Sequence, residues 1–407
     1  RTYTTQNWIE VLLTELTDEK VFLMSYEHNL ISESIANGIA DCFMNTIEAL
    51  VQDEDNINNI NSIFVSQKDF DIISSNALFD NGDASYDGPS ISEIFKTNME
   101  LYRDDVAIAS MEERITYGDL KIQTENFLSA LIQKVGRKPA RIALLMDKSP
   151  KQIVVSIACM CAGISYMPLE TELPKEVWNK WIANINAEAV VVLGDYMADV
   201  EGENYKVLNI ADIVFDKDIE GSNFIDDLDI DSEVVIINTS GTTGTPKSSS
   251  INGRALVNCI CNAYKQFNID FKVNSIAATS ICHDLSLFDI YTALCNGGSV
   301  VVPSELMKKE PAHLYNLIVD YDVNLWNSVP AFMEMLTLLD KARASEALSK
   351  LKIVILGGDW VSPALVSKIK SLSESTEVYS IGGPTETTVM NIYHKEMLNG
   401  WDQSIVY

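Results

Sequence analysis

Short apolar runs alternate with stretches of helical length through most of this chain, from residue 91 onward. The runs are rich in Val, Ile and Leu and occupy 141–146, 189–193, 234–237, 299–302 and 352–356. Segments that are apolar at every position, and are separated by helices, are typical of parallel strands covered on both faces. The pattern predicts an α/β fold with a mainly parallel sheet, whose ligands bind beyond the carboxyl ends of the strands.

The first 51 residues follow a different pattern. Apolar residues at 8–16 and 21–26 predict two short strands, and a three- and four-residue spacing from Ile35 to Leu50 predicts a helix. Residues 52–90 are rich in Asn, Asp, Ser and Gly, which bury little apolar surface, so we interpret them as a linker. The sequence therefore predicts a short α+β segment (1–51), a linker (52–90) and a large α/β domain (91–407).

Composition narrows the functions open to the chain. Its 407 residues include 58 Asp and Glu against 30 Lys and Arg, a formal net charge of -28. Such a surface repels phosphate backbones and anionic lipids, which argues against nucleic-acid and membrane partners, whereas a small nucleotide needs only a local patch of donors. The 7 cysteines lack paired C-x-x-C spacing, and we find no signal peptide or membrane-length apolar run. We expect a cytoplasmic protein with reduced cysteines.

The segment VVIINTSGTTGTPKSSS at 234–250 leads from an apolar strand into small and hydroxyl residues. Gly241 and Gly244 let backbone amides approach an anion closely, neighbouring hydroxyl groups add donors, and Lys247 adds a mobile positive charge. Pro246 stands where a Walker P-loop requires its second glycine, which argues against a Walker ATPase. The length and order of the run argue against an ordinary Ser/Gly-rich surface loop. We interpret it as a polyphosphate-binding loop.

TSGTTGTPK resembles the phosphate-binding motif of adenylate-forming enzymes and, within them, of the adenylation domains of nonribosomal peptide synthetases. Four other segments resemble further motifs of that family in the expected order: ITYGDL (115–120), CAGISYMPLE (161–170), HDLSLFDIYTALCNGGSVVV (283–302) and GGPTETTVMNIY (382–393). The resemblance covers residues 91–407. It implies the N-terminal core of an adenylation domain, with mainly parallel sheets covered by helices and with the C-terminal subdomain absent from this sequence.

The resemblance implies a nucleotide-binding role for each matching residue. The β- and γ-phosphates of ATP would be held by Thr239, Ser240, Gly241, Thr242, Thr243, Gly244 and Lys247. Glu386 would coordinate Mg²⁺, a hard cation that suits a carboxylate, and Thr385 would lie near the α-phosphate. The adenine pocket would be lined by Gly357, Gly358 and Asp359. His283 matches an aromatic position beside the active site.

Two positions depart from the family's pattern. Ser248 follows Lys247 where a glycine is usual, and Gly382 stands where an aromatic residue commonly stacks on adenine. The first departure implies either a tolerated serine or weaker nucleotide binding. The second implies that the stacking contact is lost or supplied by another residue.

Asp284 is the residue that indicates the class of substrate. The matching aspartate of amino-acid-activating members pairs with the α-ammonium group, although the residue alone would be read as a helix cap before LSLFDIYTAL. The other implied pocket positions are Leu285, Phe288, Asn327, Ile355, Gly357, Ile381, Val389 and Met390. This pocket is mostly apolar, with one amide that could accept or donate a hydrogen bond. It fits a small side chain with one polar atom: Cys first, then Thr or Ser, with a small apolar residue still open.

The implied reaction is ATP-dependent formation of an aminoacyl-adenylate, followed by loading onto the phosphopantetheine thiol of a carrier protein. LWNSVPAFMEML (325–336) resembles adenylation domains that follow heterocyclisation domains, and TTQNWIEVLLTEL (4–16) resembles the tail of such a condensation-type domain. These domains are therefore expected partners. Since the sequence begins at Arg1 without Met, we expect a piece of a longer protein, which alone binds nucleotide weakly and adenylates poorly.

Two alternatives stay open. An acyl-CoA synthetase-like enzyme would share the nucleotide motifs, but Asp284 and the condensation-like first 51 residues argue against it. A non-catalytic scaffold with the adenylation fold is favoured by the departures at Ser248 and Gly382.

Overall fold

The computed structural model divides the chain into two compact units, Arg1–Ser85 and Tyr86–Tyr407. It describes residues 9–16, 19–26, 86–193, 204–216, 228–239 and 247–396, with parts of 37–47 and residues 196 and 200. In the first unit β1 (Ile9–Leu16) pairs antiparallel with β2 (Glu19–Tyr26), and helical residues lie between 37 and 47. The two predicted strands and the predicted helix are therefore found.

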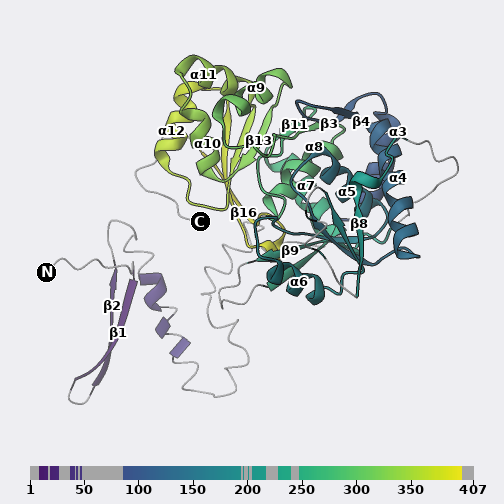
Figure 1. Cartoon of the computed structure of the whole chain (residues 1–407). Coiled ribbons are helices and arrows are strands. Elements are labelled where there is room, and N and C mark those ends of the chain that lie inside the picture. The colour runs from purple at the N-terminus through teal and green to yellow at the C-terminus, as the bar shows by residue number, and fades with distance from the viewer. Residues whose placement is uncertain are drawn as a thin grey trace. The chain divides into compact units, whose positions relative to one another are not determined.

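Two sheets form the second unit (Figure 1). The six-stranded sheet has the order β10-β9-β6-β5-β7-β8, and the eight-stranded sheet has the order β16-β15-β14-β13-β11-β12-β3-β4. Neighbouring strands are parallel except in the pairs β9–β10, β15–β16 and β3–β4. The expected mainly parallel arrangement is confirmed, but it is divided over two sheets.

The strands of the six-stranded sheet are β5 (Arg141–Leu145), β6 (Ser165–Pro168), β7 (Ala189–Val192), β8 (Lys206–Asn209), β9 (Glu233–Thr239) and β10 (Lys247–Asn252). Those of the eight-stranded sheet are β3 (Val106–Ala109), β4 (Arg114–Thr116), β11 (Asn274–Ile276), β12 (Ser299–Val301), β13 (Leu325–Ser328), β14 (Ile353–Leu356), β15 (Glu377–Gly382) and β16 (Ile392–Glu396). All five apolar runs singled out in the sequence form strands.

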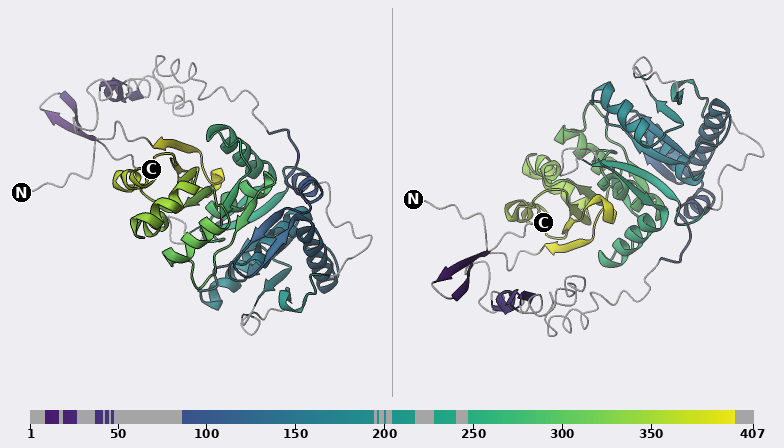
Figure 2. Two further views of the ribbon diagram at one scale, coloured as in Figure 1. Left: turned by 90° about the horizontal axis from the view of Figure 1, so that it is seen from above. Right: turned by 90° about the horizontal axis from the view of Figure 1, so that it is seen from below.

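The α-helices of this unit are α3 (Ile91–Leu101), α4 (Tyr117–Val135), α5 (Pro150–Cys161), α6 (Lys175–Asn184), α7 (Gly253–Gln266), α8 (Leu285–Cys295), α9 (Pro311–Asp320), α10 (Pro330–Thr337), α11 (Lys341–Lys350) and α12 (Pro363–Leu372). Two short 3₁₀ helices are η3 (Ile210–Asp212) and η4 (Thr385–Thr387). Figure 2 shows α9 to α12 (green to yellow) gathered at one end of the unit, apart from the blue helices.

Helix α8 is buried along its length, from Leu285 to Leu294. An apolar helix of this kind is stable only inside a core, and α8 contacts β11, β12, β13, α3 and α7. One hydrophobic cluster includes residues of both sheets, and Tyr291 of α8 shares a 3.2 Å hydrogen bond with Tyr166 of β6. The burial of α8 therefore joins the two sheets into one body.

The eight-stranded sheet is apolar on both faces. Leu325 and Ile355 belong to the cluster shared by the two sheets, whereas Trp326, Val354 and Leu356 belong to a second cluster with residues of α9 to α12. Successive side chains of a strand point to opposite faces. Odd-numbered residues of β13 and β14 thus face the same side of the sheet as α8.

The cysteines of the described residues are reduced. Cys159, Cys161 and Cys282 are buried, and Cys259, Cys261 and Cys295 are half-buried, all as free thiols. This agrees with the sequence expectation; Cys42 lies outside the described residues. Among the helices that the structure describes, none is both long and apolar enough to cross a membrane.

The turn after α8 leaves no room for a side chain at its second glycine. Gly297 has φ 73°, and the Gly298 amide donates to the Ala293 carbonyl at 2.9 Å, which closes the helix with a left-handed residue. A Cβ on Gly298 would lie 1.8 Å from the Val273 carbonyl oxygen, a backbone atom. Only glycine fits at 298 without moving β11.

We expect Gly298→Ala to lower the free energy of unfolding by about 3 kcal/mol or more, because backbone must move to make room. Gly136→Ala is the matched control. That glycine has φ 89° but nothing within 4 Å of an added Cβ, so it should lose only about 1 kcal/mol from left-handed strain. Urea unfolding of the two variants checks this. A Gly298→Ala chain as stable as Gly136→Ala would contradict the packing described here.

Candidate functional site

The predicted site residues meet at one edge of the eight-stranded sheet. Asn327 lies in β13, Ile355 in β14 and Ile381 in β15, near the carboxyl ends of three parallel strands. Asp284 lies at the N-terminus of α8, which packs on this sheet. The structure therefore brings together residues spread over about a hundred positions, at the edge where α/β folds bind ligands.

Asp284 occupies the N-cap position of α8, but its side chain makes no capping hydrogen bond. The carboxyl group is half-buried, and burial raises its pKa, although hydrogen bonds from Thr385 and from the Leu285 and Val389 backbone, and the electrostatic interaction with the neighbouring His283, oppose the rise. These donors are uncharged. The carboxylate is thus held in place with its charge only partly offset, which suits contact with a cation rather than a helix cap.

The apolar residues of the predicted pocket pack together behind Asp284. Leu285, Phe288, Ile355, Ile381 and Val389 are buried in the same cluster, and Met390 packs against it. An added Cβ on Gly357 would lie 2.6 Å from Cγ1 of Ile381, and one on Gly358 would lie 3.3 Å from Leu285. Six of the nine predicted positions therefore lie in or against one hydrophobic cluster, and Gly357 adjoins it.

Asn327 is fully buried, and its amide nitrogen is engaged by protein. Nδ2 donates to the Leu285 carbonyl at 3.0 Å and to Oδ1 of Asp289 at 2.5 Å. Oδ1 of Asn327 has no hydrogen-bond partner among the described residues. The sequence did not decide whether this amide donates or accepts. In the structure both hydrogens of Nδ2 are used by protein acceptors, so Oδ1 is the atom that remains available, as an acceptor.

The proposed phosphate loop joins β9 to β10. Lys247, the first residue of β10, pairs with Thr239, the last of β9, and the Lys247 side chain is exposed. Ser240, Gly241, Thr242, Thr243 and Gly244, together with the Thr239 side chain, lie outside the described residues. Oγ of Ser248 donates to Asn238 at 2.7 Å across the two strands. The departure at Ser248 thus has a structural role in the hairpin.

The segment after β15 brings the fifth motif to this hairpin, because η4 contacts β10. Glu386 is exposed in η4, and Thr385 is half-buried beside Asp284. Thr388 and Val389 have φ of 62° and 67°. Positive φ at β-branched residues is rare and costs energy, and such strain is concentrated at functional sites.

The predicted adenine-side residues follow β14. Gly357 is buried, whereas Gly358 and Asp359 are exposed beside Trp360, whose side chain is also exposed. Oδ1 of Asp359 accepts from the Trp360 amide at 2.7 Å. Gly382 ends β15 opposite Ile392 of β16. All four predicted residues lie near one another at the carboxyl ends of neighbouring strands.

A cavity of about 370 Å³ lies beside the site, at the carboxyl ends of β5, β6, β11 and β13. His283 lines it and is itself exposed, next to Asp284 in the chain. Lys148, Thr279 and Cys282 also line it. The predicted His283 therefore faces open space between the two sheets.

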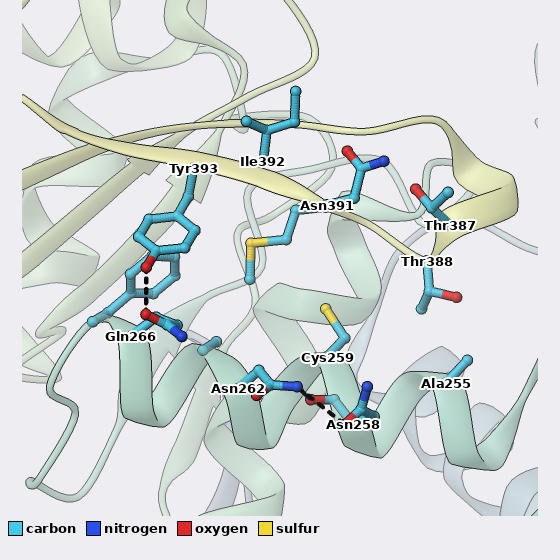
Figure 3. A pocket seen from close by; sticks show the side chains of 13 residues that line it. Ala255, Asn258, Cys259, Asn262, Gln266, Thr387, Thr388, Asn391, Ile392 and Tyr393 are labelled. Carbon is cyan, nitrogen blue, oxygen red and sulfur yellow. Dashed lines mark hydrogen bonds between the residues drawn. The ribbon is translucent and has the colours of Figure 1, made fainter. Parts of the chain in front are cut away.

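A groove of about 270 Å³ runs on the other side of the site, between α7 and the segment from η4 to β16 (Figure 3). Asn258, Asn262 and Gln266 of α7 line this groove, and Tyr393 donates to Oε1 of Gln266. Burial raises the pKa of Cys259 to about 12, while a hydrogen bond from the Met390 backbone lowers it. Of the predicted substrate-pocket residues, Met390 lines this groove.

The residues present could supply one ligand to a magnesium ion bound together with a nucleotide. No group of three or more His, Cys, Asp or Glu that could hold a metal occurs in the described part of the chain. Mg²⁺ usually takes one or two carboxylates together with phosphate oxygens and water. The exposed carboxylate of Glu386, on an element that contacts β10, can supply one such ligand.

Sequence reasoning missed a buried polar cluster beneath the pocket. Asp289 of α8 is buried, Lys148, which follows β5, is half-buried, and the two interact electrostatically. One signal was available: Asp289 is a lone carboxylate in the apolar run LSLFDIYTAL. A charge inside an apolar helix requires a polar partner, but the pattern cannot say which residue supplies it.

Comparison with known proteins agrees with the fold and with the predicted type of site. The sequence profile of the AMP-binding enzyme family matches residues 95–405. Bacitracin synthase 1 of Bacillus licheniformis is 25% identical over 397 residues, which cover 97% of this chain and 7% of that protein. Phenyloxazoline synthase MbtB of Mycolicibacterium paratuberculosis is 24% identical over 304 residues, covering 75% and 26%. The chain thus spans less than a third of either relative.

Solved structures share the fold. The nonribosomal peptide synthetase FmoA3 in its α-methyl-L-serine-AMP bound form aligns with a TM-score of 0.72 at 20% identity, covering 99% of this chain and 45% of that chain. The NpsA N-terminal subdomain of Klebsiella oxytoca, in complex with 3-hydroxybenzoyl-AMSN, aligns with a TM-score of 0.66 at 20% identity, covering 78% of each. The chain therefore belongs to the AMP-binding enzyme family and has the fold of the N-terminal core of an adenylation domain.

Proposed function

We propose that this chain activates a small amino acid with ATP for nonribosomal peptide synthesis. The observation that carries the proposal is Asp284, a half-buried carboxylate whose hydrogen-bond donors are uncharged. It lies at the mouth of an apolar pocket, one helical turn from Phe288. An α-ammonium group bound there would supply the missing positive charge, and the side chain would extend into the pocket.

In the proposed reaction a carboxylate oxygen of the amino acid attacks the α-phosphorus of ATP. A new oxygen–phosphorus bond forms, the bond from the α-phosphorus to the bridging oxygen breaks, and pyrophosphate leaves. No side chain needs to form a covalent bond, so positioning and charge stabilisation lower the barrier. Lys247 and the loop of residues 239–244 would hold the phosphates, and Asp284 would hold the amino acid. Magnesium held by Glu386 would offset phosphate charge.

The substrate class proposed is Cys, with Thr and Ser next. The support is a small apolar lining with one polar acceptor, Asn327. Two similar proteins agree with this substrate class: one is a phenyloxazoline synthase, and one structure holds an adenylate of α-methyl-L-serine. A hydroxyl or thiol on the β-carbon is what ring closure to an oxazoline or thiazoline requires.

The partners proposed are a carrier protein with a phosphopantetheine thiol and a condensation or heterocyclisation domain. Bacitracin synthase 1 aligns over 97% of this chain, a share that exceeds the AMP-binding segment. That extended match supports an assembly-line context. The assignment of residues 1–51 to the tail of a condensation-type domain stays a prediction, as do the domain boundaries at 51 and 90 and the cytoplasmic location.

We expect Asp284→Asn to weaken binding of an aminoacyl-sulfamoyl adenosine about 30-fold or more, because truncating one partner of a buried charge pair removes its attraction. The deamino analogue, which lacks the ammonium group, is the matched control ligand. Its affinity should be the same for the variant and the unaltered chain. Calorimetric titration measures both. Equal weakening of the two ligands would show that Asp284 acts on the fold rather than on the ammonium group.

The raised pKa of Asp284 predicts opposite pH effects on binding and on stability. Affinity for the ammonium-bearing ligand should fall as the pH drops through the raised pKa, since the neutral carboxyl no longer attracts a cation. A carboxyl with a raised folded-state pKa stabilises the fold below its ordinary pKa and loses that contribution as the pH rises. Asp284→Asn should therefore melt at the same or a higher temperature than the unaltered chain at neutral pH. A clearly lower melting temperature would contradict this account.

Glu386→Gln should reduce the thermal stabilisation that a nonhydrolysable ATP analogue gives in the presence of Mg²⁺, with an affinity loss of about tenfold, because the metal loses an anionic ligand. Without Mg²⁺ the variant and the unaltered chain should bind the analogue equally. Glu374→Gln, an exposed site beyond α12, is the control. A magnesium-dependent gain that survives in Glu386→Gln would exclude Glu386 as the metal ligand.

A further inference from the structure

A lysine of one sheet holds a backbone segment of the other. Lys148 follows β5 of the six-stranded sheet, and its Nζ donates to the Ala277 carbonyl at 2.5 Å and to the Thr279 carbonyl. Both carbonyls lie after β11 of the eight-stranded sheet, in residues 277–284, which are neither helix nor strand. Ala277 and Thr279 are buried, and a buried carbonyl outside regular structure needs a donor. Lys148 therefore satisfies two backbone groups that belong to the other sheet.

Asp289 of α8 holds the same segment. Its side chain is buried, and its Oδ2 accepts from the Thr279 amide at 3.1 Å. Thr279 is thus bound at its amide by a carboxylate and at its carbonyl by an ammonium group. Burial raises the pKa of Asp289, and the positive charge of Lys148 opposes that rise. Removing either charge would leave the other poorly hydrated and uncompensated, so the two together act as a clamp on Thr279.

The clamped segment leads directly to Asp284. The His283 amide donates to the Ser280 carbonyl at 3.0 Å, and Oγ of Ser286 donates to the His283 carbonyl at 2.7 Å. These bonds close a turn that ends at Asp284, the N-cap residue of α8. A displacement of Thr279 would therefore be transmitted through the turn to the Asp284 carboxylate.

The position of Lys148 has an electrostatic cost. Lys148, Thr279 and His283 line the cavity of about 370 Å³, so a lysine here could keep its ammonium group in open space. Instead the side chain is half-buried, and burial lowers the pKa of Lys148, while the charges of Asp289 and Glu305 oppose the fall. A role in holding the segment explains why the ammonium group is turned toward the two carbonyls.

We propose that Lys148 is a positioning residue for Asp284. Together with Asp289 it fixes the start of the segment that ends at Asp284, so that the carboxylate is already ordered when the ammonium group of the amino acid arrives. Lys148 acts through the backbone and not by contact with the ligand. This inference rests on the proposed function and adds to it a residue of the other sheet, on which recognition of the ammonium group depends.

The test compares two ligands that differ only in the ammonium group. They are the seryl-, threonyl- or cysteinyl-sulfamoyl adenosine that the full chain binds most tightly, and its deamino analogue. Calorimetric titration gives the ratio of the two affinities. Lys148→Met removes the charge and keeps a side chain of similar length, so the ratio should fall about tenfold. Lys148→Arg can still donate to both carbonyls and should keep most of the ratio.

Lys309→Met is the matched control. Lys309 lines the same cavity but is exposed, so its loss should leave the ratio unchanged. If Lys148 contacted the ligand, or served only the fold, Lys148→Met would weaken both ligands equally and the ratio would stay the same, which overturns the proposal. An equal fall of the ratio in Lys309→Met would assign the effect to positive charge in the cavity and would overturn it as well.

The outcomes separate this inference from the proposed function. If the unaltered chain binds the two ligands equally, Asp284 does not recognise an ammonium group and both proposals fall. If the unaltered chain prefers the ammonium-bearing ligand and Lys148→Met keeps that preference, the positioning role alone is wrong.

Hydrogen exchange followed by mass spectrometry shows where Lys148→Met acts. In the ligand-free chain, a peptide covering 277–284 should exchange about tenfold faster in this variant, because the Thr279 amide loses its fixed acceptor geometry. A peptide covering α12, at the far end of the same sheet's helices, should exchange as in the unaltered chain. Unchanged exchange over 277–284 contradicts the proposal.

Should Lys148→Met not fold, the double variant with Asp289→Asn decides. It removes both charges, and the asparagine can still accept from the Thr279 amide. The ratio should fall about tenfold in the double variant, whereas Asp289→Asn alone keeps the two bonds from Lys148 and should retain more of the ratio. Equal ratios in these two variants would contradict the role of Lys148.

Discussion

The burial of α8 is the constraint on which the site depends. This helix is mostly apolar and is buried along its length, so it forms only where both sheets can cover it. Its N-terminus then ends at the carboxyl ends of β13, β14 and β15, and that position decides where Asp284 lies. The tight turn at Gly297 and Gly298 closes the other end against Val273. A shift of α8 would displace Asp284, Leu285 and Phe288 together.

The charged side chains of the candidate site are better explained by ligand binding than by a gain in stability. The chain carries a net charge of -28, yet its proposed substrate ATP is itself anionic. Under the proposed function, binding would depend on local groups, namely Lys247, the segment that joins β9 to β10, and a metal held by Glu386. Asp284 and Lys148 are half-buried and Asp289 is buried, and charges removed from water seldom add net stability.

Much of this architecture could be predicted from the sequence. The continuous apolar runs identified five of the strands, because a parallel strand covered on both faces has no polar side. Family motifs predicted Asp284, Glu386 and the pocket residues as site residues, a prediction that the structure leaves untested although it places several of them near one another. The division into two sheets could not be predicted, since apolar periodicity does not reveal which strands pair. The pairing of Lys148 with Asp289 also escaped, because 141 positions separate the two residues.

The orientation of Asn327 shows a second limit of sequence reasoning. An amide can donate and accept, and its composition alone leaves both roles open. Two neighbours of the amide determine which of its ends is free. They are the Leu285 carbonyl, on the residue after Asp284, and the Asp289 carboxylate, one helical turn further. Polarity of a pocket is therefore set by the neighbours of its lining residues.

The most direct test of the central claim is amino-acid-dependent exchange of radiolabelled pyrophosphate into ATP by the full-length protein. The account predicts exchange that requires Mg²⁺ and one of Cys, Thr or Ser, and that Asp284→Asn abolishes while the protein stays folded. Exchange supported equally by a fatty or aryl acid without an amino group, or unchanged in Asp284→Asn, would contradict it.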